Sequence, residues 1–252
     1  MGNCCYHNKQ IIKEGFLYES IKDQIRPFDV IFMKGNKIFS MVESILVSRG
    51  SKYPDSKEYT HVGMVITSDI LDHPLMKKGE LYIFESVISG KLDYGIYNIE
   101  GNGFSGVQIR NLRELVYGYD SPNETKVAFG KLTNNPIDVM PMEQVKQMFT
   151  EIYNTYNGCS YDLNPYSLLG SVVPCVRPMR HFVEEICRTE DWLFCSELVA
   201  LVYKYFKIYP DHVNPRNVLP RDIAFPKSDT DQMPCILSEL IKMTIPMHYS
   251  AK

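Results

Sequence analysis

The segment DWLFCSELVALVYKYF (residues 191–206) combines a helical pattern with a cysteine near its start. Its apolar positions recur at helical spacing, at Cys195, Leu198, Val199, Val202 and Phe206. This spacing places the Cys195 sulfur on the buried face of a helix. A free cysteine in such a place is usually a small apolar core residue, but a cysteine at a helix start can also be a nucleophile. A base supplied by another part of the chain would distinguish the two.

The segments before this helix predict a sheet. Short runs rich in Val, Ile and Phe, bounded by Gly, Pro or polar loops, are expected as strands within residues 26–35, 60–67, 81–87, 106–112 and 125–132. Their succession along the chain predicts a sequentially connected, largely antiparallel sheet.

Three other segments have helical periodicity. They cover residues 38–45, residues 142–156 with a stop at Asn157-Gly158, and residues 236–242. Helices before and after a run of strands give an α+β fold class, with an antiparallel sheet packed against helices.

Composition and charge narrow the class of protein. The 252 residues are 44% hydrophobic and 23% charged, which is typical of a folded chain with one large domain or two small ones. A net charge of −3 without a basic cluster argues against a nucleic-acid partner. The 7 cysteines are odd in number and form no Cys-x-x-Cys pair, and we recognise no secretion signal before them. We therefore expect reduced cysteines in an intracellular compartment, with no metal site and no cofactor.

The N-terminal sequence MGNCCYHN raises the question of a lipid anchor. Gly2 can be myristoylated once Met1 is removed, and Cys4 and Cys5 can be palmitoylated. One myristoyl chain binds membranes only marginally, so stable anchoring would need the second signal. The motif departs from the myristoylation pattern at Tyr6, where Ser or Thr is preferred. The alternative is an unmodified N-terminus.

His61 and Glu85 are the best partners for Cys195 in the sequence. A cysteine nucleophile needs a nearby base and a third group that orients the base. Of the 6 histidines, His61 begins an alternating strand, and Gly63 follows where backbone can approach closely. Glu85 interrupts an otherwise apolar strand face, where a carboxylate is costly unless it is paired. If the two strands are neighbours, Glu85 can reach His61 across them. The alternative is a half-buried structural histidine and an edge-strand glutamate in water.

The other cysteines fit this chemistry less well. Cys159 and Cys187 lie beside turns and charged residues, and Cys175 lies inside an apolar stretch without a helix start. Cys195 would gain thiolate stability from the helix dipole and from a nearby imidazolium. We therefore interpret the others as packed or incidental thiols.

The order of RPFDVIF, THVGMVI, LYIFESV, YNGCSYD and FCSELV resembles the circularly permuted branch of the NlpC-type papain-like cysteine hydrolases. YiiX-like bacterial proteins and a poxvirus relative belong to that branch, in which the histidine strand precedes the cysteine helix. The resemblance implies a permuted papain-like domain over residues 26–226, with residues 163–191 as an insertion. Residues 1–25 are then an N-terminal lead-in and residues 227–252 a C-terminal extension.

The resemblance also implies roles for individual residues. Cys195 would be the nucleophile, His61 the general base and Glu85 the group that orients the imidazole. Tyr161 matches a tyrosine near the site of YiiX-like proteins, so it is expected at the substrate-binding site. The backbone N–H of Cys195 is the natural oxyanion donor, because the first N–H groups of a helix have no partner within it.

Three functions follow as expectations. The first is a thiol hydrolase that cleaves an amide or ester bond of a peptide, amide or lipid acyl substrate through a thioester. The second is a membrane-associated lipid acyl hydrolase or acyltransferase, anchored by the lipidated N-terminus. The third is a non-catalytic structural or virion component that retains the fold, in keeping with the resemblance to a viral protein.

Overall fold

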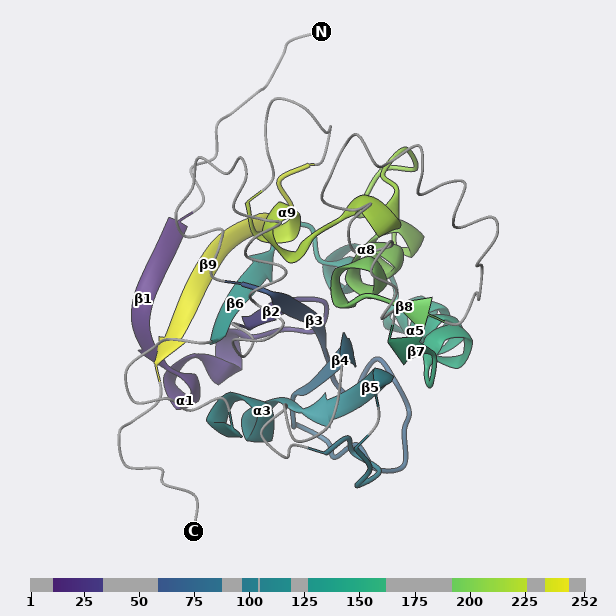
Figure 1. Cartoon of the computed structure of the whole chain (residues 1–252), viewed down its shortest axis with the longest axis horizontal. Coiled ribbons are helices and arrows are strands. Elements are labelled where there is room, and N and C mark those ends of the chain that lie inside the picture. The colour runs from purple at the N-terminus through teal and green to yellow at the C-terminus, as the bar shows by residue number, and fades with distance from the viewer. Residues whose placement is uncertain are drawn as a thin grey trace, which may run out of the picture.

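The structure is a computed structural model that describes residues 11–33, 59–87, 97–103, 105–118, 127–161, 192–225 and 234–244. Within these residues, one mixed sheet of nine strands runs through the molecule in the order β1-β9-β6-β2-β3-β4-β5-β7-β8 (Figure 1). The strands are β1 (Ile11–Leu17), β2 (Val30–Met33), β3 (His61–Ile66), β4 (Tyr82–Val87), β5 (Gly106–Asn111), β6 (Val127–Leu132), β7 (Ser160–Tyr161), β8 (Trp192–Leu193) and β9 (Leu237–Thr244).

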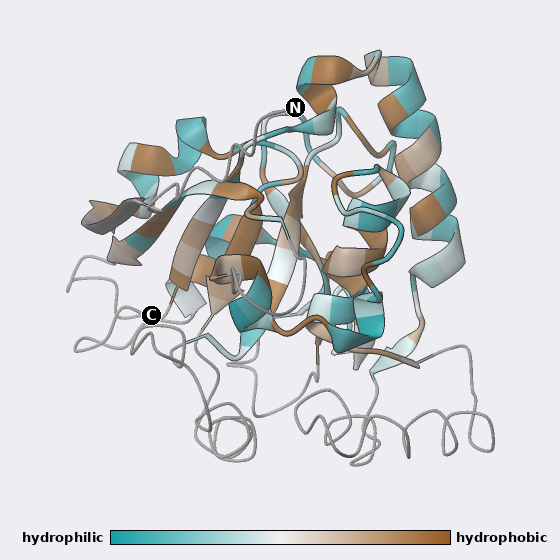
Figure 2. Ribbon diagram, turned by 90° about the horizontal axis from the view of Figure 1, so that it is seen from above, coloured by the Kyte–Doolittle hydropathy of each residue, from teal (hydrophilic) through white to brown (hydrophobic). Residues whose placement is uncertain are grey.

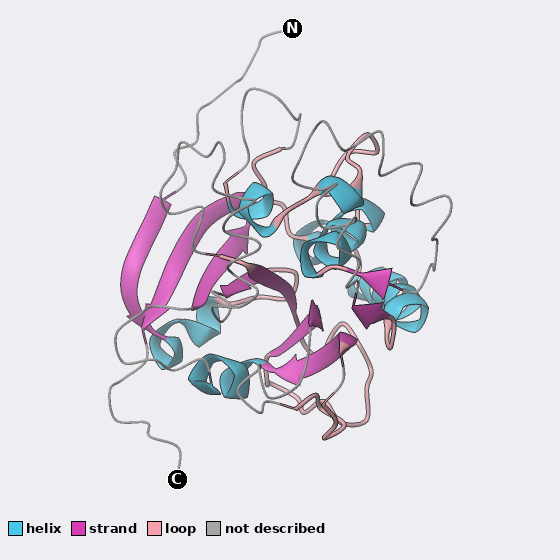
Figure 3. Ribbon diagram, in the orientation of Figure 1, coloured by secondary structure: helices cyan, strands magenta, loops and turns pink. Residues whose placement is uncertain are grey.

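Helices accompany the sheet on both faces, which makes the fold class α+β, as predicted (Figure 3). They are α1 (Tyr18–Ile21), η1 (Lys22–Gln24), α3 (Leu112–Gly118), α4 (Pro136–Val139), α5 (Met142–Tyr156), α8 (Cys195–Tyr205), η4 (Pro215–Asn217) and α9 (Pro220–Ala224). The predicted helix over residues 142–156 is confirmed. It ends before Gly158, whose φ of 81° lies in the left-handed region that glycine adopts without strain.

The predicted central strands are confirmed, and so is their antiparallel pairing. β2, β3, β4 and β5 are consecutive neighbours, each antiparallel to the next. β6 departs from the sequential order, because it pairs with β2 on the side away from β3. The two outer pairs, β1 with β9 and β7 with β8, are parallel.

The prediction of a C-terminal helix over residues 236–242 is wrong, because residues 237–244 form strand β9. Leu237 and Leu240 face one core of the molecule, whereas Ile241 and Met243 face the other. A strand buried on both faces has apolar residues at both odd and even positions. In residues 236–242 these apolar residues recur at a spacing that is also typical of a helix. β9 pairs with β6 and β1, whose positions along the chain are distant.

The polar lead-in expected at the N-terminus is also more structured than the sequence indicated. Residues 11–17 form β1, parallel to β9, and α1 and η1 follow directly. β1 and β9 therefore belong to the same sheet as the strands of residues 26–226.

Several expectations lie outside the described residues. These are the helix over residues 38–45, the insertion over residues 163–191 and the lipidation sites Gly2, Cys4 and Cys5. In the part of the chain that is described, no helix has the length and apolar character needed to cross a membrane.

The larger core lies between the sheet and the helices α5, α8 and α9. Val62, Met64 and Phe84 of the sheet pack there with Phe149 of α5 and Val199 of α8. Figure 2 shows hydrophobic residues concentrated on the strands between the helices. This packing fixes the start of α8 relative to β3 and β4.

The smaller core lies on the opposite face. Val65 and Ile83 pack there with Ile21 of α1 and Leu115 of α3. Val62 and Val65 thus point to opposite faces of β3, as side chains at even and odd positions of a strand do.

Gly63 allows β3 and β4 to pack closely beside the candidate site. A Cβ atom added at Gly63 would lie 2.5 Å from Ile83 Cδ1 and 2.9 Å from Glu85 Cβ. We therefore expect Gly63→Ala to lower the free energy of unfolding by about 1–3 kcal/mol, because it overpacks a filled region. Urea denaturation measures this loss. Ile83→Val removes the atom that clashes first, so Gly63→Ala should cost less in that background; an equal cost would contradict the steric explanation.

Candidate active site

The first turn of α8 presents Cys195 and is held in place by its neighbours. The Ser196 hydroxyl donates to the Val218 carbonyl at 2.7 Å. Glu197 accepts from the Phe194 N–H at 3.5 Å and pairs with the Arg216 guanidinium at 3.2 Å. Cys195 itself is 2% exposed and has no disulfide partner. The helix therefore begins at a fixed position, with the cysteine as its first residue.

His61 lies at the start of β3, opposite Met33 of β2. Its side chain is buried, and Nε2 lies 2.5 Å from Glu85 Oε2. Glu85 is fully buried on β4, the antiparallel neighbour of β3. The sequence prediction that Glu85 reaches His61 across neighbouring strands therefore agrees with the structure.

Cys195 is the second interaction partner of His61. Burial lowers the pKa of His61, but charge interaction and hydrogen bonding with Cys195, together with those of Glu85, outweigh it. The net effect raises the pKa of His61 from 6.5 to about 10. Glu85 contacts Nε2, so Nδ1 is the ring nitrogen that Glu85 does not occupy. The structure thus brings together the three residues expected at the site.

Arg110 is a fourth member of this cluster that the sequence analysis missed. It lies on β5 and is fully buried, with Nε 2.5 Å from Glu85 Oε1. Burial raises the pKa of Glu85, but Arg110 and His61 outweigh this effect and lower it from 4.5 to about 2. Glu85 is therefore a carboxylate held between a guanidinium and an imidazole.

Arg110 escaped notice because its strand alternates in an ordinary way. In GVQIRN, apolar Val107 and Ile109 alternate with polar Gln108 and Arg110, a pattern typical of a strand with one face in water. A buried carboxylate at Glu85 calls for a counter-charge. The sequence therefore indicated that Glu85 needs a positively charged partner. Local spacing does not reveal the register of β5 against β4, which places Arg110 beside Glu85.

Tyr161 lies next to the start of α8. Its ring packs edge to face against Phe194, the residue before Cys195, with ring centroids 5.9 Å apart. Tyr161 is 9% exposed and ends β7, which is parallel to β8. It thus supports the segment that leads into the cysteine, and its role toward a substrate stays a prediction.

Within the described residues, no group of three or more His, Cys, Asp or Glu side chains is arranged to hold a metal ion. The cluster consists of one cysteine, one histidine, one carboxylate and one guanidinium. This set suits nucleophilic and acid–base chemistry by side chains.

Comparisons with known proteins find similarity among solved structures. No protein family matches the sequence, and no curated protein matches it. Among solved structures, the chain is similar to the crystal structure of the metalloprotein yiiX from Escherichia coli O157:H7, with a TM-score of 0.39 and 16% identity. The similarity covers 87% of this chain and 89% of that one. The function proposed below therefore depends on the chemistry of the cluster itself.

Proposed function

We propose that the protein is a thiol hydrolase of the permuted papain-like type, which cleaves an amide or ester bond with Cys195, His61 and Glu85. The observation that carries the proposal is the buried Glu85–His61 pair with Cys195 as the other partner of the imidazole. A nucleophile, a base and a group that orients the base are the three parts such chemistry needs. The order of the histidine strand β3 before the cysteine helix α8 supports the permuted arrangement.

The first half of the reaction forms a thioester. His61 takes the proton of Cys195, and Sγ attacks the substrate carbonyl carbon to form an S–C bond. His61 then gives its proton to the leaving nitrogen or oxygen as the C–N or C–O bond breaks. In the second half, water loses a proton to His61 and attacks the thioester, which releases the acid and restores the thiol.

Two further groups would assist these steps. The Cys195 backbone N–H is at the N-terminus of α8, so it can donate to the oxygen that becomes negative during attack. Glu85 fixes the orientation of the imidazole ring. Arg110 stabilises the negative charge of Glu85. Glu85 and Arg110 thus act as positioning residues.

The proposal is tested by trapping the acyl-enzyme. Incubation with an activated ester, such as p-nitrophenyl acetate, should add one acetyl group to Cys195, detected by intact-mass and peptide mass spectrometry. The adduct should disappear with time, because the thioester is hydrolysed. Cys195→Ala should abolish both the adduct and p-nitrophenol release, whereas Cys159→Ala should change neither. Acetylation spread equally over several cysteines would refute the proposal.

A further inference from the structure

One buried hydrogen bond joins the strand that carries Glu85 to the segment that leads into Cys195. The Ser86 hydroxyl donates to the Leu193 carbonyl at 2.6 Å, and both residues are buried. Ser86 directly follows Glu85 on β4, and Leu193 is two residues before Cys195. The bond therefore connects two parts of the cluster that are about a hundred residues apart in the chain.

The two faces of β4 hold different parts of the site. Neighbouring side chains of a strand point to opposite faces, so Glu85 and Ser86 lie on different sides of the sheet. Glu85 contacts His61. Ser86 lies opposite Val107, a residue of the larger core, and so faces the side on which α8 packs. β4 thus holds the imidazole with one side chain and the segment before the cysteine with the next.

Other contacts of α8 lead to a different part of the molecule. The polar side chains of its first turn contact Val218 and Arg216, which follow α8 in the chain. β8 is two residues long and lies at the end of the sheet, next to β7. Apolar packing of α8 on the sheet is non-directional, whereas a hydrogen bond fixes a distance and an angle. Ser86 supplies such a directional link to β4.

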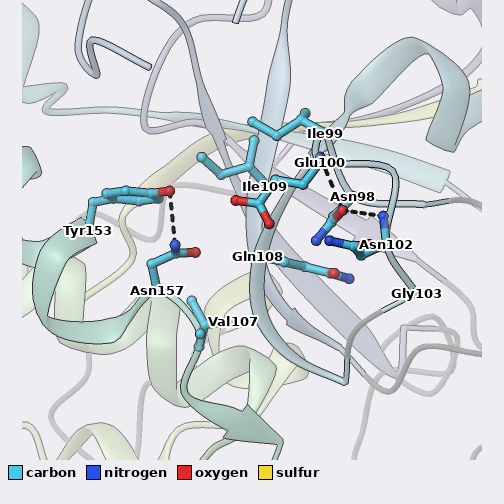
Figure 4. Close-up of a pocket in the computed structure, with 11 residues that line it drawn as sticks. Asn98, Ile99, Glu100, Asn102, Gly103, Val107, Gln108, Ile109, Tyr153 and Asn157 are labelled. Atoms are coloured by element: carbon cyan, nitrogen blue, oxygen red, sulfur yellow. Dashed lines mark hydrogen bonds between the residues drawn. The ribbon is translucent and has the colours of Figure 1, made fainter. Parts of the chain in front are cut away.

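Ser86 acts through the protein and not on a substrate. A pocket lies on its side of the sheet, between β5, the turn of residues 98–103 and the C-terminal end of α5 (Figure 4). Val107 is one of the described residues that line this pocket, whereas Ser86, its neighbour across the strands, is not. The Ser86 hydroxyl is fully buried and donates its proton to Leu193. It therefore has no donor to offer to a reacting molecule.

We propose that Ser86 is a positioning residue that fixes Cys195 relative to His61 through its hydrogen bond to Leu193. A nucleophile must be held close to its base and to the carbonyl, and a displacement of about 1 Å can slow an enzyme roughly 100-fold. Without the hydroxyl, the segment before α8 would lose its directional contact with β4. That the alignment serves hydrolysis rests on the proposed function; the alignment itself does not.

The test replaces Ser86 in the full chain and follows the site in two ways. Mass spectrometry measures the rate of Cys195 acetylation by p-nitrophenyl acetate, and NMR of the labelled imidazole measures the pKa of His61. Ser86→Ala should slow acetylation by about tenfold or more. It should also lower the pKa of His61 from about 10, because Cys195 is one of the groups that raise it. Ser86→Thr keeps the hydroxyl and should restore most of both values.

Tyr203→Phe is the matched control. It removes another buried hydroxyl, which donates to the Phe28 carbonyl at 2.7 Å from the C-terminal half of α8. The two variants lose the same kind of bond, so both should lower the melting temperature. Only Ser86→Ala should change the acetylation rate and the pKa of His61, because Tyr203 is about two helical turns away from Cys195.

Several outcomes would overturn the proposal. They are a wild-type rate or a wild-type pKa of His61 in Ser86→Ala, equal slowing in Tyr203→Phe, or slow acetylation in a Ser86→Thr variant of wild-type melting temperature. If Ser86→Ala does not fold, Ser86→Cys replaces it. Because a thiol is a weaker donor, an intermediate rate is expected there, and a wild-type rate counts against the proposal. If wild-type Cys195 is not acetylated, the hydrolase proposal fails, whereas the pKa of His61 still tests Ser86.

Discussion

Replacing His61 by alanine is expected to slow alkylation of Cys195 by iodoacetamide roughly 100-fold at mildly acidic pH. An ordinary thiol is almost fully protonated there and reacts slowly, whereas a thiolate paired with an imidazolium stays reactive. The raised pKa of His61, about 10, keeps the imidazolium present from acidic through neutral pH. The difference in rate between wild type and His61→Ala should therefore persist over that range. Peptide mass spectrometry measures labelling at each cysteine.

Internal and matched controls accompany this measurement. Cys159 and Cys235 report general thiol reactivity in the same sample. His73→Ala removes a histidine that contacts Tyr153 and lies outside the cluster, so Cys195 labelling should not change. Glu85→Gln should slow labelling less than His61→Ala, because the amide still contacts the ring but lacks the charge. Equal Cys195 labelling in wild type and His61→Ala would show that the cysteine is a core residue and not a nucleophile.

Arg110→Met is expected to lower the free energy of unfolding by about 3–5 kcal/mol, because it leaves the Glu85 carboxylate buried without its guanidinium. In the folded wild type the pKa of Glu85 is lowered to about 2, so its charge contributes stability above its ordinary value of 4.5. That contribution disappears as the pH falls toward 2. The deficit of Arg110→Met should accordingly be largest near neutral pH and shrink on acidification. Urea denaturation at several pH values measures it.

A double-mutant cycle separates charge from packing. Glu85→Gln together with Arg110→Met removes both charges, so the pair should be less destabilising than the sum of the single changes. Additive costs would mean that Arg110 acts only by filling space. Lys131→Met provides a control at a partly exposed cation of β6, with an expected effect within about 0.5 kcal/mol.

Much of the candidate site could be predicted because each residue broke or completed a local pattern. Cys195 stood at the start of a helical repeat, His61 at the start of an alternating strand, and Glu85 on an apolar face. Each of these contrasts is visible within a few residues. The meeting of His61 with Glu85 then needed only that β3 and β4 be neighbours, which is the common outcome for consecutive strands. Cys195 also needed α8 to pack against the sheet.

Other features depend on contacts between distant parts of the chain. Arg110 looked like a solvent-facing strand residue until the register of β5 against β4 placed it beside Glu85. Residues 236–242 looked helical because burial on both faces removes the alternation that identifies a strand. Neither register nor double-sided burial is encoded in local spacing, so sequence patterns could not supply them.

The pairing of β1 with β9 has a mechanical consequence. The strands are parallel, with Ile11 opposite Glu239 and Leu17 opposite Thr244, so β1 begins and β9 ends at opposite ends of their ladder. Tension applied between the two ends of the chain would slide these strands along each other and load their hydrogen bonds together, instead of opening them one by one. The force would pass directly from β1 to β9. β3, β4 and α8, which carry the cysteine, histidine and glutamate, lie outside that path.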